Sequence, residues 1–129
     1  MPGIAYFEGQ FVPLAEAKIS IMTHALNYGT GVFEGIRAYW NAEQEQLYVM
    51  RLRDHYRRLL QSTELLRMQL PLSADQMSDL TVELLRREGY RGDVYVRPLA
   101  YKADEVIGVR LHNLRDAFAI FAVPVNSLP

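Results

Sequence analysis

The sequence predicts an α+β fold, namely a two-layer domain with a mainly antiparallel sheet and two helices. Two observations lead to this prediction. Segments rich in β-branched and aromatic residues stand both before and after two stretches in which apolar residues recur at three- and four-residue spacing. The chain of 129 residues, 50% of them hydrophobic, also has the size of one domain with one core.

Composition excludes several classes of function. Lys and Arg number 14 against 15 Asp and Glu, so the net charge of -1 creates no field that would draw the chain to nucleic acid or to an anionic membrane. Cysteine is absent, which excludes disulfides and thiolate metal sites. No apolar run approaches the roughly 20 residues of a membrane span, and the first residues do not resemble a signal peptide. We therefore expect a cytoplasmic protein.

The first quarter of the chain predicts short strands. Residues 5–7 and 10–12 form a β-hairpin around Gly9, and Pro13 ends its second strand. Residues 18–22 alternate polar and apolar side chains, which predicts another short strand. A turn or a single helical turn is expected at residues 24–28.

The middle of the chain predicts a long hairpin and then two helices. Residues 32–40 and 47–50 are rich in β-branched and aromatic side chains, and we expect them to form the centre of the sheet. The first helix is predicted from an apolar stripe at three- and four-residue spacing, made of Leu52, Tyr56, Leu59, Leu60, Thr63 and Leu66. The second begins with a capping box at Ser73 and Gln76 and ends at Gly89.

The last third predicts two strands separated by a loop. Residues 94–101 alternate in a β pattern, residues 102–114 form the loop, and residues 117–123 are almost wholly apolar, as in a strand buried on both faces. The following VPVNSLP is typical of an interdomain linker. We therefore predict a domain over residues 1–123, a linker that starts at residues 124–129, and a further domain in a longer protein.

Two predicted strands each combine an arginine with an aromatic residue on one face. Phe33 and Arg37 are four positions apart with Gly35 between them, and Tyr95 and Arg97 are two apart, so period two places each pair on one face. An arginine between aromatic walls suits a carboxylate. The alternatives are that Arg37 pairs on the outer face with Glu34 or Glu43, and that Arg97 packs on Tyr95 for stability alone.

The other polar residues give weaker indications of a functional site. Arg58 could bind a phosphate, but an i,i+4 surface pair with Asp54 explains it equally well. The three histidines, His24, His55 and His112, have no spacing that indicates a metal site, and we expect them to be structural or exposed. No P-loop, dinucleotide fingerprint or nucleophile elbow occurs, and no catalytic acid–base pair can be argued from spacing.

Three runs taken together, HALNYGTGVFEGIRAY, RLRDHYRRL and YVRPLAY, resemble the fold-type IV pyridoxal-phosphate enzymes. Among these the resemblance is greatest to the branched-chain amino-acid aminotransferases, and it covers nearly the whole chain as the family's N-terminal small domain. It implies pyridoxal 5'-phosphate as cofactor, amino-acid and 2-oxo-acid substrates, and a homodimer or larger homo-oligomer.

The resemblance also implies roles for particular residues. Arg58 matches the arginine that binds the cofactor phosphate. The substrate pocket, with apolar walls for a branched side chain and an arginine for the second carboxylate of glutamate, matches Phe33, Gly35, Arg37, Tyr95 and Arg97. Tyr28 and Val109 match residues that reach into the active site of the other subunit.

The match stops short of the catalytic lysine. In the family this lysine, which holds the cofactor covalently, follows the interdomain linker, and neither Lys18 nor Lys102 matches it. No residue of this chain is therefore assigned a catalytic role, and we expect the chain by itself to be inactive. Residues 102–113 and Asn27 also depart from the family pattern. The rival readings are the small domain of a D-amino-acid aminotransferase or aminodeoxychorismate lyase, or a non-catalytic binding or dimerisation module.

Overall fold

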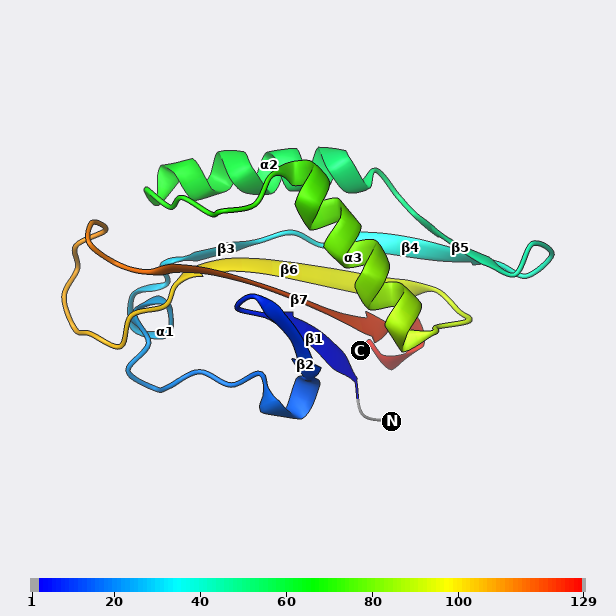
Figure 1. Ribbon diagram of the computed structural model, residues 1–129, viewed down its shortest axis with the longest axis horizontal. Coiled ribbons are helices and arrows are strands. Elements are labelled where there is room, and N and C mark those ends of the chain that lie inside the picture. Colours follow the sequence, from blue (N-terminus) through cyan, green and yellow to red (C-terminus); the bar gives the residue numbers. More distant parts are fainter. Residues whose placement is uncertain (1–2, 129) are drawn as a thin grey trace.

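A computed structural model describes residues 3–128 and confirms the α+β class (Figure 1). The sheet has seven strands, which are β1 (Ile4–Phe7), β2 (Gln10–Pro13), β3 (Gly31–Phe33), β4 (Ile36–Asn41), β5 (Gln46–Val49), β6 (Val94–Lys102) and β7 (Asp116–Pro124). The α-helices are α1 (His24–Tyr28), α2 (Leu52–Leu65) and α3 (Ala74–Glu88), and two 3-10 turns cover Leu14–Glu16 and Val125–Ser127.

The strands are antiparallel in the order β2-β1-β7-β6-β4-β5, and β3 also pairs with β6. The two longest strands, β6 and β7, therefore form the centre. Our prediction that the long hairpin, now β4 and β5, forms the centre is wrong, because β5 lies at one edge. The nine-residue β6 and β7 pair along their whole length, whereas β5 pairs over only four residues.

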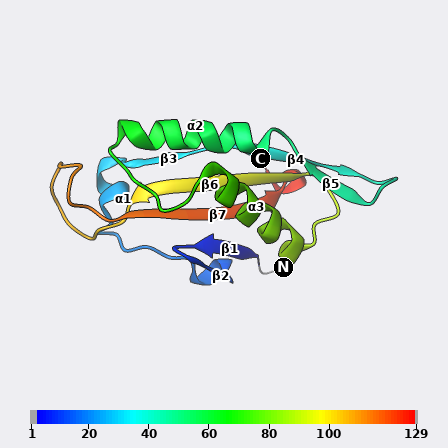
Figure 2. The same cartoon turned by 45° about the horizontal axis from the view of Figure 1, so that its top comes forward.

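Two helices cover one face of the sheet, with α2 running alongside β3 and α3 crossing the strands (Figures 1 and 2). The capping box at Ser73 and Gln76 is present, and Gly89 ends α3 in the left-handed conformation, as predicted. The core lies between these helices and the inward side chains of the strands, and its fully buried members include Ile36, Tyr56, Leu59, Met77, Leu84, Val96 and Ile120. The turn or single helical turn predicted at residues 24–28 is α1, which is a helix in addition to the two predicted ones.

The strand predicted at residues 18–22 does not form. Met22 N–H donates to the hydroxyl of Ser20 and Thr23 N–H donates to the Ser20 carbonyl, so the chain turns here. Ile19 and Ile21 alternate with polar residues, yet both side chains are exposed. Alternation indicates a strand only where a neighbouring strand takes the backbone hydrogen bonds, and no strand within residues 3–128 pairs with this segment.

The strand predicted at residues 32–40 is interrupted. β3 ends at Phe33 and β4 starts at Ile36, and both pair with β6. The two residues between them, Glu34 and Gly35, lie outside both strands. Glu34 contacts residues of α2, whereas Gly35 packs against the side chain of Tyr95. This break therefore brings Glu34 to α2 and Gly35 to Tyr95.

Candidate functional site

The face of the sheet opposite α2 and α3, here called the open face, carries the aromatic–arginine pairs. Ile36 and Val96 pair across β4 and β6 and point into the helical core, so their neighbours Arg37, Tyr95 and Arg97 point the other way. The predicted period-two placement is thus confirmed for Tyr95 and Arg97. Phe33, which stacks on Arg97, shares this face with Arg37, although the two residues belong to different strands.

Arg97 is fixed by two aromatic residues. Its guanidinium carbon lies 4.2 Å from the centroid of the Phe33 ring, and its Nη2 donates to the Tyr95 hydroxyl at 2.7 Å. The guanidinium is therefore stacked on an aromatic ring, as the packing alternative expects, and only its Nη2 has a side-chain partner among residues 3–128. Its Nε is buried and has no hydrogen-bond partner within the described part of the chain. An arginine held this way, with an unused donor, is suited to a carboxylate.

Gly35 is required by the Tyr95 ring. A Cβ at position 35 would lie 2.6 Å from the Tyr95 hydroxyl oxygen and 3.1 Å from two carbons of that ring, so no side chain fits without movement. The group that requires a glycine at position 35 is therefore the side chain of Tyr95. Gly35 and Tyr95 belong to one unit with Phe33 and Arg97.

Arg37 stands beside this unit and is exposed. It pairs in register with Tyr95, and no acidic side chain among residues 3–128 contacts its guanidinium. The alternative in which Arg37 pairs with Glu34 or Glu43 is wrong, because Glu34 turns to the other face of the sheet. Arg37 therefore remains available to an anion.

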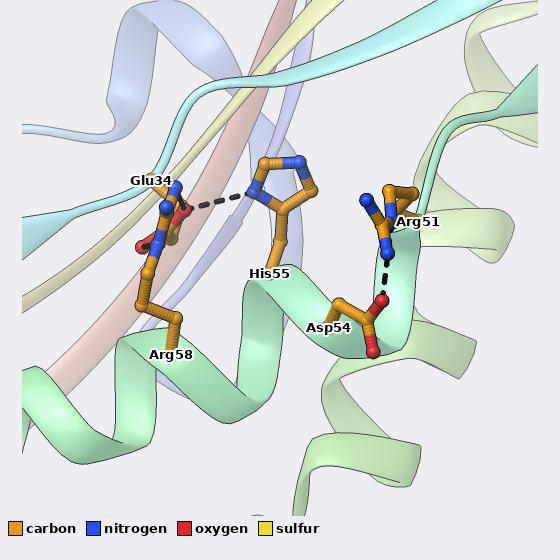
Figure 3. Close-up of polar contacts among 5 residues, drawn as sticks. All are labelled: Glu34, Arg51, Asp54, His55 and Arg58. Atoms are coloured by element: carbon orange, nitrogen blue, oxygen red, sulfur yellow. Dashed lines mark hydrogen bonds and ion pairs between the residues drawn. The ribbon is translucent and has the colours of Figure 1, made fainter.

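Arg58 lies on α2 and binds Glu34, as Figure 3 shows. Its Nε and Nη2 donate to the two carboxylate oxygens of Glu34 at 2.8 and 2.7 Å, and Nδ1 of His55 lies 2.8 Å from the same carboxylate. The alternative of a surface pair between Arg58 and Asp54 is wrong, since Asp54 pairs with Arg51 and Arg57. Glu34 occupies one edge of the guanidinium and leaves the Nη1 end available.

Glu34 is nearly buried, and burial by itself raises the pKa of its carboxyl group. The hydrogen bonds and positive charges of Arg58 and His55 outweigh burial, so the pKa of Glu34 is lowered overall. A carboxyl group whose pKa is lower in the folded state than its usual value of about 4.3 stabilises the fold above that value, and this stabilisation is lost as the pH falls through the folded pKa.

We therefore expect the Glu34→Gln variant to have a lower free energy of unfolding than the wild type at pH 7. This difference in stability is expected to narrow as the pH falls below about 4.3. Urea unfolding measured between pH 7 and pH 3 tests this. The control is Asp54→Asn, which removes an exposed carboxylate and is expected to differ little from the wild type in stability at any pH. Parallel stability curves for Glu34→Gln and wild type would contradict the assignment.

Tyr28 belongs to α1 and Val109 to the loop of residues 103–115, and these two segments lie side by side at one end of the molecule (Figures 1 and 2). The Tyr28 hydroxyl accepts a hydrogen bond from the Gly108 N–H at 2.8 Å, and the next side chain, Val109, is 81% exposed. His24 is fully buried beneath them and hydrogen-bonded, so the expectation of a structural histidine is confirmed for this residue.

The structure thus places the predicted site residues in three groups. One group shares the open face and contains Phe33, Gly35, Arg37, Tyr95 and Arg97. Arg58 lies on α2, joined to that group through the Glu34–Gly35 break, and Tyr28 with Val109 forms the third group. Sequence reasoning did not single out Glu34 as the partner of Arg58 or His24 as the partner of the loop, because both contacts join residues distant in sequence.

An apolar cleft of about 560 Å³ adjoins the first group. Phe33 belongs to both, and the cleft continues over Phe7, Ala25, Leu99 and Phe121 on the open face. None of the described residues that line it is charged. The site therefore combines apolar walls with arginines at their border, which suits a ligand that has a carboxylate and an aliphatic part.

Two further features of residues 3–128 concern metals and membranes. No group of three or more His, Asp or Glu side chains in this range could hold a metal ion. None of the helices described is long and apolar enough to cross a membrane.

The fold agrees with the comparison to known families. The chain belongs to the amino-transferase class IV family, whose model matches residues 31–129. Within that family it is similar to branched-chain-amino-acid aminotransferases. It is 49% identical over 117 residues to the probable branched-chain-amino-acid aminotransferase of Aquifex aeolicus, an alignment that covers 91% of this chain and 38% of that protein.

Solved structures give the same result. The branched-chain aminotransferase of Thermoproteus uzoniensis with norvaline superimposes with a TM-score of 0.90 and 42% identity, over 96% of this chain and 41% of that one. The branched-chain amino acid aminotransferase of Thermobaculum terrenum in its PLP-bound holo form gives 0.86 and 35%, over 95% and 40%. The chain therefore spans about two fifths of the length of these relatives.

Proposed function

We propose that these residues form the small domain of a pyridoxal 5'-phosphate-dependent aminotransferase that moves the amino group between leucine, isoleucine or valine and 2-oxoglutarate. The domain covers residues 1–123, and residues 124–129 begin the linker to a larger cofactor-holding domain. The small domain supplies the substrate-side wall of the active site.

The observation that carries this proposal is the position of Arg97. Phe33 and Tyr95 hold its guanidinium at the border of an uncharged, apolar surface, with a buried Nε that has no partner in the described chain. The apolar surface suits a branched aliphatic side chain. The arginine suits the second carboxylate of glutamate, so one pocket can take both substrates of the exchange.

The residues present also fit the cofactor. Arg58 has a 66% exposed side chain, and because Glu34 occupies only its Nε and Nη2 edge, the Nη1 end can donate to a phosphate. When bound, pyridoxal phosphate supplies the electron sink for transamination. Lys102 is 1% exposed and paired with Asp116, so it is not free to hold the cofactor covalently. We place that lysine in the larger domain.

The assembly is part of the same proposal. Val109 and the Tyr28 region form an exposed end that would contribute to the active site of a second subunit in a cytoplasmic homodimer. The competing functions are the small domain of a D-amino-acid aminotransferase or aminodeoxychorismate lyase and a non-catalytic binding or dimerisation module. Each competing function predicts a different substrate result.

The test is to assay aminotransferase activity with a panel of substrates, using the protein encoded by the complete reading frame. We expect turnover of leucine, isoleucine and valine with 2-oxoglutarate, and little with D-alanine or aminodeoxychorismate. The reverse preference, or no lysine-bearing domain downstream, would overturn the proposal in favour of a competing function.

The Arg97→Met variant examines the role of the arginine in the same assay. Because the lost donors face the second carboxylate, we expect kcat/KM for glutamate to fall on the order of 100-fold, and kcat/KM for leucine to fall less than about tenfold. Arg57→Met, which changes an exposed arginine on α2, is the control and is expected to be neutral. Equal losses for glutamate and leucine would contradict the assigned role.

A further inference from the structure

His24 makes more contacts than a buried histidine needs for packing. Its side chain is fully buried, with Nδ1 2.7 Å from the Thr30 hydroxyl and Nε2 2.6 Å from the Gly108 carbonyl oxygen. Its main-chain N–H donates to the Asp104 carbonyl at 2.9 Å. One residue of α1 therefore binds the loop of residues 103–115 at two points.

The partners of the imidazole determine where its proton lies. A carbonyl oxygen only accepts, so Nε2 must carry a hydrogen and donate it to Gly108. In the neutral ring Nδ1 is then the acceptor, and the Thr30 hydroxyl donates to it. Both ring nitrogens are satisfied and the ring is fully buried, which strengthens each bond.

The loop is fastened separately at its base and at its tip. At the base, Ala103 N–H donates to the Arg115 carbonyl at 2.8 Å, and Arg115 N–H donates to the Asp104 carboxylate at 3.1 Å. At the tip, Gly108 is held by two side chains of α1, since its N–H donates to the Tyr28 hydroxyl and its carbonyl accepts from His24.

The two tip contacts depend on each other. The His24 and Tyr28 rings lie 4.7 Å apart between centroids, so the imidazole also supports the tyrosine that binds the Gly108 N–H. In the described structure the other side-chain hydrogen bond at the tip, from Arg110 to the His112 carbonyl, stays within the loop. Loss of His24 would therefore release the tip while leaving the base closed.

We propose that His24 is a positioning residue that holds the tip of the loop, and with it Val109, in place for substrate binding. The part of this proposal that concerns substrate rests on the proposed function, whereas the part that concerns the loop does not. Because Val109 directly follows Gly108 and its side chain is exposed, its position is set by the anchoring of Gly108. A merely structural histidine would stabilise the whole fold without acting selectively on this tip.

The first test needs no variant. In the 129-residue chain labelled with ¹⁵N, NMR of the histidine rings is expected to show His24 with a proton on Nε2 that does not exchange rapidly with solvent. A His24 ring with an unprotonated Nε2 would overturn the proposal, because the bond to Gly108 could not then exist.

The second test measures amide hydrogen exchange at Gly108. His24→Leu is expected to speed exchange at Gly108 on the order of tenfold or more, relative to amides in the centre of β6. His24→Gln can keep a donor near the position of Nε2 and is expected to retain most of the protection. His112→Ala, which changes an exposed histidine in the same loop, is the control. Equal acceleration at Gly108 and in β6, or no acceleration, would overturn the proposal.

The third test uses the complete aminotransferase. His24→Leu is expected to raise KM for the amino acid about tenfold, with kcat reduced less than about threefold, and His24→Gln is expected to recover most of the loss. An inactive wild type would count against the proposed function while leaving the exchange result intact. An active enzyme whose KM is unchanged by His24→Leu, despite faster exchange at Gly108, would overturn the link to substrate.

Discussion

Replacing Gly35 with alanine is expected to destabilise the domain by about 1–3 kcal/mol and to disrupt the aromatic–arginine unit. The new Cβ would lie 2.6 Å from the Tyr95 hydroxyl oxygen, so either the ring or the backbone between β3 and β4 must move. Because Tyr95 binds Arg97, movement of the ring also displaces the guanidinium. Urea unfolding measures the stability, and kcat/KM of the complete enzyme is expected to fall by more than about tenfold.

Two comparisons make the Gly35 prediction specific. Gly92→Ala is the matched control, since a Cβ at position 92 meets nothing within 4 Å. Combining Gly35→Ala with Tyr95→Phe removes the closest contact and is expected to restore part of the stability, although the ring carbons remain near. If Gly35→Ala were as stable and active as Gly92→Ala, the tight packing of Tyr95 on this glycine would not be a requirement of the site.

Replacing Asp116 with alanine is expected to cost about 3–5 kcal/mol, because it leaves the Lys102 ammonium buried without its counter-charge. Nζ of Lys102 lies 2.8 Å from Oδ1 of Asp116 and donates to the Arg67 carbonyl at 3.0 Å, while Gln69 N–H donates to the other carboxylate oxygen. A loss of this size is a large part of the roughly 5–15 kcal/mol that keeps a domain folded. Urea unfolding at pH 7 measures it.

The double variant Lys102→Met with Asp116→Leu distinguishes a buried charge from a general packing defect. Replacing both partners with apolar residues is expected to recover most of the stability, since no charge is then left without a partner. The control is Asp54→Ala, which breaks an exposed pair and is expected to cost less than about 1 kcal/mol. A cost below about 1 kcal/mol for Asp116→Ala would show that Lys102 reaches water when its partner is removed.

The elements that depend on neighbouring residues were predictable from the sequence. The β1–β2 hairpin follows from a turn at Glu8 and Gly9, both of which have positive φ. The second predicted helix follows from the capping box at Ser73 and from Gly89. Helix caps and tight turns are local, because their hydrogen bonds join residues only a few positions apart, and so the sequence pattern contains the whole cause.

The errors arose where pairing between distant segments decides the outcome. Residues 18–22 alternate as a strand would, but none of the strands described pairs with them. The hairpin of β4 and β5 is rich in β-forming residues, yet β7 pairs with β1 and β6 and so excludes it from the centre. Both outcomes depend on which segments become neighbours, and periodicity within a segment carries no information on that.

The same distinction applies to the site. Period two within β6 correctly placed Tyr95 with Arg97, because alternation of side chains is a local property of the backbone. Phe33 and Arg37 also share a face, although the break at Glu34 and Gly35 divides their predicted strand into β3 and β4. The local pattern could not show that the two pairs become neighbours through β6, nor that Tyr95 would pack on Gly35. The i,i+4 pairing of Arg58 with Asp54 was also reasonable locally, but Glu34, 24 residues away, takes the guanidinium instead.

By itself the sequence determined the α+β class, the existence of most elements, the family resemblance and the aromatic–arginine pairs of the open face. Only the tertiary structure decided which strand lies in the centre, which carboxylate holds Arg58, and which histidine fastens the loop that carries Val109. The physical reason is the range of the interactions. Periodicity, capping and turns act over a few residues, whereas register, burial and buried hydrogen bonds join residues that the chain separates by dozens of positions.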